Sequence, residues 1–244
     1  MSSRRGKEEG EEGEGEEEET VTDAPLGRSL RTPRAAGATG IVFALVLVSV
    51  IVLVHSAIPG GPGHGTAWLG GAGSREAARV ALELLPFAGI AFLWFMGAVR
   101  SHFGQAEDKF FANVFLGSGL LFVATLFAYA ASAGGLLAAG GRQSGTGLFV
   151  WEYGRESSFT LLNKYCMRMA AVFAACTSTI GNRLGVFPRP LAWFGYLVAV
   201  ILLFVAPASA WFELAFPVWV LLVSVYLLAA SGSRERTSLA EGVS

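Results

Sequence analysis

Charged residues are scarce in this sequence, and histidine and cysteine are nearly absent. Of its 244 residues, 15% are Asp, Glu, Lys or Arg, whereas 53% are hydrophobic, and the mean hydropathy is positive. An ordinary soluble domain is excluded, because about 25% of the residues in such domains are charged. The composition indicates an integral membrane protein whose main partner is the lipid bilayer.

The few cysteines and histidines exclude other kinds of site. Cys166 and Cys176 lie ten residues apart on one expected helix, which separates them by about 15 Å and prevents a disulfide between them. We interpret both as small apolar fillers. The three histidines, His55, His64 and His102, have no ligand-like spacing and no CxxC motif accompanies them, so we expect no metal site.

Enzyme motifs are also missing. The sequence contains no HExxH, no GxSxG and no phosphate-binding loop, and the glycine-rich run GGPGHG lacks the flanking residues that such a loop requires. Ser178 and Thr179 have no His or Asp near them in the sequence, so we expect their hydroxyls to bond to their own helix. We therefore expect a non-enzymatic protein with no cofactor and keep a membrane enzyme acting on lipid as a third hypothesis.

The charges that are present are divided unevenly. Residues 1–20 hold nine glutamates against three basic residues and almost nothing apolar, which predicts disorder from residue 1 to 35, ending in a basic juxtamembrane linker. This acidic tail is either a solvated spacer or a segment that binds a protein partner. Elsewhere the basic residues stand singly beside apolar segments, a pattern that argues against nucleic-acid binding.

Apolar runs of membrane-spanning length predict an all-α bundle of six transmembrane helices within residues 36–231, followed by a polar C-terminal tail at 232–244. We favour a retained first span over a signal peptide, because its basic flank is long and contains an acidic tract. The connection at 136–158 is predicted to be a long interfacial loop. The expected spans are 37–57, 77–99, 110–135, 159–181, 190–206 and 211–230.

The basic residues at the span ends predict the orientation. Three lie at one end of the bundle (Arg75, Arg142 and Arg155), whereas nine lie at the other. The positive-inside rule places the richer end, and with it both termini, in the cytoplasm. The nine are Arg28, Arg31, Arg34, Arg100, Lys109, Arg183, Arg189, Arg234 and Arg236.

Polar residues lie inside the three spans that run inward under this topology. A charge at the centre of a span costs about 2.5–3.5 kcal/mol on insertion scales, so it normally faces a partner or water. We expect Glu83 to pair with Arg168, and Glu213 with Lys164 or Arg79. The candidate intramembrane cluster consists of Arg79, Glu83, Asn163, Lys164, Arg168 and Glu213.

Two roles for this cluster compete. In the first it is mainly structural, because paired charges would specify how the helices assemble, and the protein is a polytopic membrane protein of unknown biochemical role. In the second it lines an outward-facing cavity for an ion, a small polar substrate or a lipid headgroup, as in a small transporter or channel-like module. A proton relay with Glu83 as the carrier is a variant of the second role. No sequence feature supports a homo-oligomer, which is left open.

Four runs carry a resemblance: LPFAGIAFLWFMGAVR, EDKFFANVFLGSGLLF, MRMAAVFAACTSTIGNRLGVFPRPLAWFGY and ELAFPVWVLLVSVYLL. Over residues 77–230 the chain resembles an uncharacterised family of small multi-pass membrane proteins of high-GC Gram-positive bacteria. The resemblance implies a bacterial inner-membrane location and supports six spans. It implies no activity, cofactor or catalytic residue, and it does not include the acidic tail.

Overall fold

The computed structural model describes residues 33–57, 72–103, 109–139, 146–205 and 210–241. Within these ranges every residue is helical except the turn at 184–188, and there is no strand, which confirms the all-α prediction. All of them belong to one unit, Thr32–Ser244. The acidic tail at 1–32, the glycine-rich loop at 58–71 and the last residues at 242–244 lie outside the described residues. The disorder predicted for 1–35 therefore stays a prediction for 1–32 and is wrong for 33–35, which are helical.

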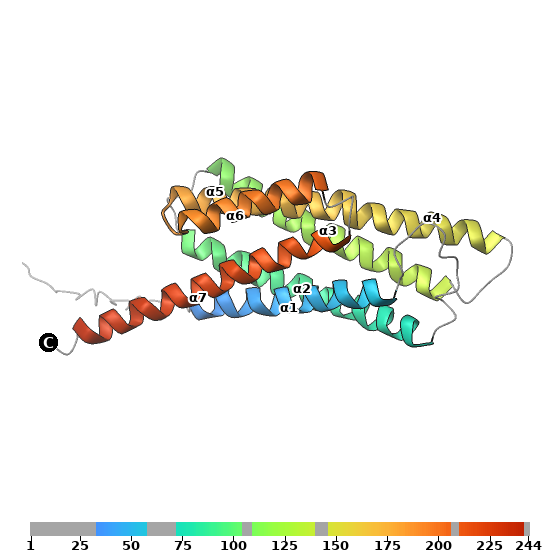
Figure 1. Cartoon of the computed structure of the whole chain (residues 1–244), viewed down its shortest axis with the longest axis horizontal. Coiled ribbons are helices and arrows are strands. Elements are labelled where there is room, and N and C mark those ends of the chain that lie inside the picture. Colours follow the sequence, from blue (N-terminus) through green and yellow to red (C-terminus); the bar gives the residue numbers. More distant parts are fainter. Residues whose placement is uncertain (1–32, 58–71, 104–108, 140–145, 206–209, 242–244) are drawn as a thin grey trace, which may run out of the picture. The chain divides into compact units, whose positions relative to one another are not determined.

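In the part of the chain that the structure describes, ten helical elements follow one another (Figure 1). Each predicted span falls within helical residues, except that residue 206 at the end of the fifth lies outside the described residues. The loop predicted at 136–158 is wrong in part, because residues 136–139 and 146–158 are helical and 140–145 lie outside the described residues. The last helix continues through the predicted polar tail to Glu241. The elements are α1 Pro33–Ala57, α2 Ala72–Phe103, α3 Lys109–Ala139, α4 Thr146–Thr160, η3 Leu161–Cys166, α5 Met167–Arg183, α6 Arg189–Val200, η4 Ile201–Val205, η6 Ala210–Leu214 and α7 Ala215–Glu241.

The helices α4 and α5 form one continuous helix through the π-helical segment η3. Thr160 and Cys166, at the two junctions, both have helical backbone angles (φ −63°, ψ −43° and φ −61°, ψ −49°). At 1.5 Å per residue the helix from 146 to 183 is on the order of 55 Å long. This length exceeds a hydrocarbon core of about 30 Å, so a membrane-inserted helix of this length extends beyond the core or tilts strongly.

Among the described residues, three helices are long and apolar enough to cross a membrane: Arg75–Phe103, Lys109–Ala138 and Trp211–Ala230. Two further apolar helices, Gly37–Leu53 and Arg189–Val205, are shorter. The chain is therefore a membrane protein, whereas the count of six spans stays a prediction. The predicted fourth span is absent from both groups, and it is the one that carries Lys164 and Arg168.

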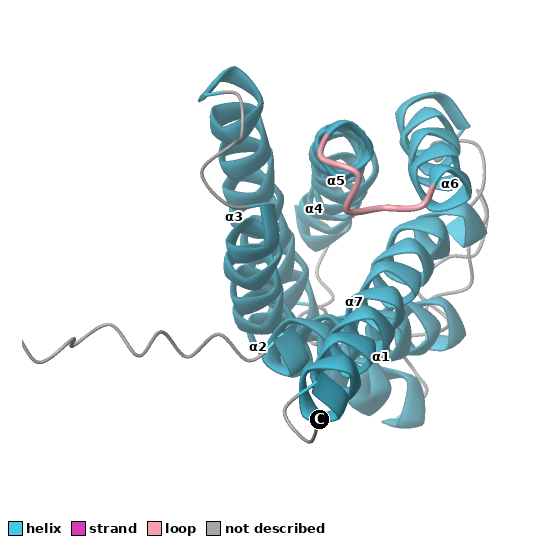
Figure 2. Ribbon diagram, turned by 90° about the vertical axis from the view of Figure 1, so that its left-hand side faces the viewer, coloured by secondary structure: helices cyan, strands magenta, loops and turns pink. Residues whose placement is uncertain are grey.

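The helices form a closed ring in which α1, α2, α3, α5, α6 and α7 each pack against the next and α7 packs against α1 (Figure 2). Small residues allow close approach at two of these contacts. A Cβ atom added to Gly40 of α1 would meet the Ser224 hydroxyl of α7, and one added to Gly195 of α6 would meet the Ser178 hydroxyl of α5. Side chains larger than glycine would force these helices apart.

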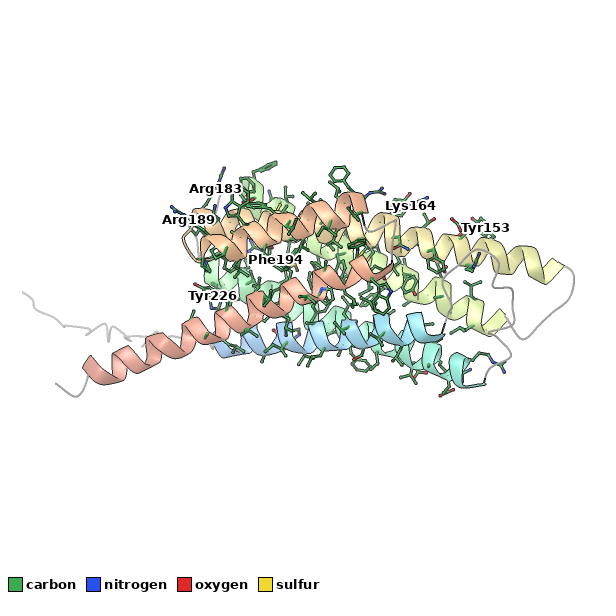
Figure 3. The ribbon with its side chains drawn as sticks, viewed as in Figure 1. Tyr153, Lys164, Arg183, Arg189, Phe194 and Tyr226 are labelled. Carbon is green, nitrogen blue, oxygen red and sulfur yellow. The ribbon has the colours of Figure 1, made fainter. Side chains whose placement is uncertain are left out.

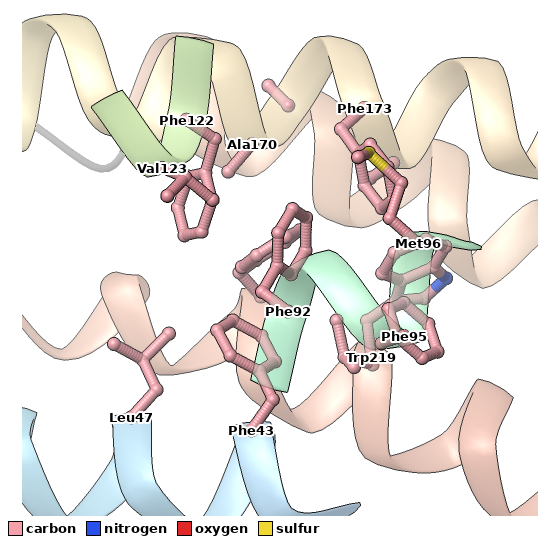
Figure 4. Packing of buried hydrophobic residues seen from close by; sticks show 14 of the residues in the cluster. Phe43, Leu47, Phe92, Phe95, Met96, Phe122, Val123, Ala170, Phe173 and Trp219 are labelled. Atoms are coloured by element: carbon pink, nitrogen blue, oxygen red, sulfur yellow. The ribbon is translucent and has the colours of Figure 1, made fainter. Parts of the chain in front are cut away.

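Five buried phenylalanine rings from five helices fill the centre of the ring (Figure 4). The Phe92 centroid lies 4.9 Å from those of Phe43 and Phe122, 5.0 Å from that of Phe173 and 6.0 Å from that of Phe216. Such tilted and edge-on arrangements are favourable for aromatic pairs. We call these five residues the aromatic layer. It occupies the space that the helices enclose, where a central channel would have to pass.

A tight turn joins α5 to α6. Gly185 has φ +65°, a left-handed conformation that glycine adopts at little cost. The N–H of Phe187 donates to the carbonyl of Gly181 at 3.0 Å, and that of Leu184 donates to Ile180 at 3.0 Å. These bonds satisfy carbonyls at the end of α5. The turn thus fixes where α6 begins and which of its faces packs on α5.

Candidate functional site

The structure does not gather the six residues of the candidate cluster into one buried group. Glu213 is buried, with 2% of its surface exposed. Asn163 is half-buried, and its side-chain oxygen is buried without a hydrogen-bond partner. The four other members, Arg79, Glu83, Lys164 and Arg168, are exposed.

Arg79 lies near the start of α2, and its partner is a residue that the sequence interpretation did not consider. Its Nη1 lies 3.6 Å from Oε2 of Glu76, one turn earlier on the same helix. The two side chains are 67% and 66% exposed. Because water screens such a pair, it contributes about 0–1 kcal/mol to stability, and Glu213 takes no part in it.

The predicted ion pair between Glu83 and Arg168 is wrong. Arg168 instead donates from Nη1 to the backbone carbonyl of Lys164 at 3.0 Å, in an exposed setting. The reason is geometric: Glu83 is on α2 and Arg168 on α5, α3 stands between these helices in the ring, and both side chains are exposed. Helical side chains lean toward the N-terminus of their helix, which is also the direction that Arg168 takes.

Arg168 lies far from the turn that ends α5. It precedes residue 184 by sixteen positions, about 24 Å along the helix. Figure 3 shows Arg183 and Arg189 at the end of the bundle with the turn, and Lys164 toward the other end.

Glu213 is the member of the cluster that lines a small cavity. The 3₁₀ segment η6 carries its carboxyl group to a cavity of about 20 Å³ where the helices of the ring converge. One water molecule needs at least about 10–15 Å³ measured in this way. Apolar side chains make up almost the whole wall: Leu47, Val50 and Ile51 of α1, Leu85 of α2, Leu126 and Tyr129 of α3, Leu162 of η3 and Met167 of α5.

Few polar groups accompany this carboxylate. Tyr129, 7% exposed, lines the same cavity. Cys166 is fully buried nearby, and its thiol donates a long bond of 3.8 Å to the carbonyl of Phe122. Within the part of the chain that the structure describes, the Glu213 side chain has neither an ion pair nor a hydrogen bond. A buried carboxylate without such partners is costly when ionised.

Irregular helical segments surround the cavity. The π-helix η3 contributes Leu162 to its wall, and the bond from the N–H of Met167 to the carbonyl of Leu162 spans five residues rather than four. A second π-helix, η4, packs against η6, which itself packs against α1. Segments of π-helix are rare and are frequent at functional sites. One of them lines the cavity beside Glu213, and the other packs against the segment that carries Glu213.

The cavity lies on one side of the aromatic layer. Glu213 precedes Phe216 by three residues. On each of the helices α1, α2, α3 and α5, the residues that line the cavity lie on the same side of that helix's phenylalanine, toward the same end of the bundle. On α3, for example, Leu126 follows Phe122 by four residues. The space beside Glu213 is therefore at the end of the bundle where η4 leads to η6. The aromatic layer separates it from the end with the α5–α6 turn.

Sequence reasoning did not assign Tyr129 or Cys166 to the site. Tyr129 lies within the third expected span at 110–135, and its hydroxyl group inside an apolar run was the signal that could have found it. Cys166 carried no such signal, because a buried thiol has the same pattern as a small apolar residue. Among the described residues, no three His, Cys, Asp or Glu side chains converge in a way that could hold a metal ion.

Comparisons of this chain with models of protein families, with curated proteins and with solved structures gave no match.

Proposed function

We propose that this chain is a multi-pass protein of the bacterial inner membrane with six spans and both termini in the cytoplasm. Support comes from helices at all six expected positions and from the ring that they form. Arg183 and Arg189, which belong to the nine basic residues assigned to the cytoplasmic side, lie together at the end with the α5–α6 turn (Figure 3). This orientation makes the opposite end, beside Glu213, the outer end.

We further propose that the protein is a small, non-enzymatic transport module that binds a cation at Glu213. The observation that carries this proposal is a single buried carboxylate on the wall of a cavity, without an ion pair among the described residues. Ionisable groups at membrane depth normally mark an ion pathway or have a partner. The aromatic layer supplies a barrier on the cytoplasmic side of the site, as transport by alternating access requires.

A purely structural role is the competing explanation, and the exposed charges weaken it. Arg79 has a surface partner, and Arg168 is bonded to its own helix, so neither holds the carboxylate of Glu213. A structural carboxylate without a partner costs stability and contributes no specificity. The structural explanation therefore predicts that replacing Glu213 with leucine is neutral or stabilising and leaves any transport unchanged.

The test is transport by the purified protein in liposomes. Proteoliposomes and empty liposomes are given gradients of H⁺, Na⁺, K⁺ and small organic cations, with a dye or isotope for each. The proposal requires flux of at least one cation above the leak of empty liposomes, and its loss in Glu213→Gln. Flux that survives this substitution, or no flux for any cation in either direction of the gradient, would overturn it.

A further inference from the structure

The size of the Glu213 cavity restricts what the carboxylate can bind. About 20 Å³ accommodates one water molecule and nothing larger without movement of the helices. An amine with carbon substituents is larger than this volume. The space that the described side chains leave beside Glu213 therefore suits an ion or a molecule of the size of water.

The described residues on the cavity wall offer too few side-chain oxygen atoms for a metal cation. Calcium takes six to eight oxygen ligands, and magnesium requires near-octahedral coordination. The side-chain oxygens among these residues are the Glu213 carboxylate and the Tyr129 hydroxyl, and the other lining residues are Leu, Val, Ile and Met. A single carboxylate is, by contrast, sufficient to bind a proton.

We propose that the ligand is a proton, exchanged between Glu213 and one water molecule in the cavity. This inference rests on the proposed function and names its substrate. On binding, the carboxylate takes H⁺ from a hydronium ion and one water molecule remains; on release, the carboxyl group returns H⁺ to water. The neutral carboxyl group can then donate a hydrogen bond, and the Tyr129 hydroxyl on the same cavity wall is a candidate acceptor after side-chain rotation.

Among the residues that the structure describes, few other groups that titrate lie near Glu213. Tyr129 of α3 and Cys166 of η3 interact with it electrostatically. The lining residues from α1, α2 and α5 have no titratable group, and η4, which packs against η6, has the sequence ILLFV. Arg168 and Lys164, which would compete with a proton for the negative charge, are exposed and turned away.

The test follows the carboxyl carbon of Glu213 by NMR in protein whose glutamates carry ¹³C at Cδ. The Glu213 resonance is identified as the one missing in Glu213→Gln, and Glu83→Gln, which removes an exposed glutamate of α2, is the matched control. Should Glu213→Gln not fold, Glu213→Asp identifies the same resonance while a carboxylate remains. We expect the resonance to move from its ionised to its protonated position as pH falls. The chemical shift of this resonance should not change when the choline in the buffer is replaced by Na⁺, K⁺, Mg²⁺ or Ca²⁺ at constant ionic strength.

A resonance that does not move over the pH range in which the protein stays folded would overturn the proton assignment, and so would a shift caused by any metal cation. This measurement is separate from transport. Titration without flux in liposomes would retain the proton site and reject the proposed function. Flux of Na⁺ or K⁺ that depends on Glu213 would retain the function and reject the proton.

Discussion

Replacing Phe92 with alanine removes the ring that joins α2 to four other helices through the aromatic layer. The side chain is fully buried, and its ring centroid lies 4.9–6.0 Å from those of four phenylalanines. Because lipid rather than water surrounds the protein, the transfer of the ring out of water contributes little to the free energy of unfolding. The loss comes instead from the cavity and from the missing ring contacts.

The size of this loss can be worked out from the two contributions. The substitution removes roughly 100 Å³, which at about 24 cal/mol per Å³ costs about 2.4 kcal/mol if nothing relaxes. Four ring contacts at about 0.5 kcal/mol each add about 2 kcal/mol. Partial collapse of the site reduces the sum, so we expect the free energy of unfolding to fall by about 3–4 kcal/mol.

The assay is reversible unfolding of the purified protein in mixed micelles, followed by circular dichroism. Phe87→Ala is the matched control, because Phe87 is on the same helix but 64% exposed, and we expect it to cost less than about 1 kcal/mol. Equal losses for the two variants would refute the conclusion that the aromatic layer holds the ring of helices together.

Three further predictions concern the helix contacts, the exposed charges and the topology. Gly195→Ala should lower the free energy of unfolding by about 1–3 kcal/mol, because a Cβ atom there meets buried side chains of α5 and α7. The control is Gly97→Ala, which should be neutral or stabilising because nothing lies within 4 Å of the added Cβ atom. Equal effects of the two substitutions would contradict the close contact at Gly195. Arg168→Gln should change stability by no more than about 0.5 kcal/mol, because the side chain is exposed; a loss of several kcal/mol in thermal unfolding would indicate a buried partner instead. In a variant with both native cysteines replaced, a cysteine at Tyr153 should react with an impermeant maleimide added outside intact cells and one at Ser101 should not; the reverse pattern would invert the predicted topology.

The sequence predicted the helices well, because span length and hydropathy are local properties. Sequence reasoning did not predict helix where a helix continues beyond its apolar residues. The α4 segment reads as a loop because Glu152, Arg155 and Glu156 interrupt the apolar pattern, yet a helix outside the hydrocarbon core has no need to be apolar. For the same reason, the polar residues 232–241 were not recognised as the end of α7.

The site was predictable in part. Glu213 was included in the candidate cluster because a carboxylate inside an apolar run is unusual. This argument does not depend on knowing which residue pairs with Glu213. The pairing of Glu83 with Arg168 could not be tested by sequence, since it depends on which helices are neighbours and on the direction of each side chain. Tyr129 and Cys166 were missed because their position beside Glu213 follows from the packing of α3 and η3 against η6, which no local pattern records.

The most direct test of the proposed site is the proton flux of paired variants, Glu213→Gln and Glu83→Gln, reconstituted at equal density and measured with a pH-sensitive dye inside the liposomes. The two substitutions are chemically identical, and they differ in that Glu213 is 2% exposed whereas Glu83 is on the surface of α2. We predict that Glu83→Gln retains the flux of the native protein and that Glu213→Gln falls to the leak of empty liposomes. Native flux in Glu213→Gln, or its loss in Glu83→Gln alone, would contradict the assignment of Glu213 as the binding group.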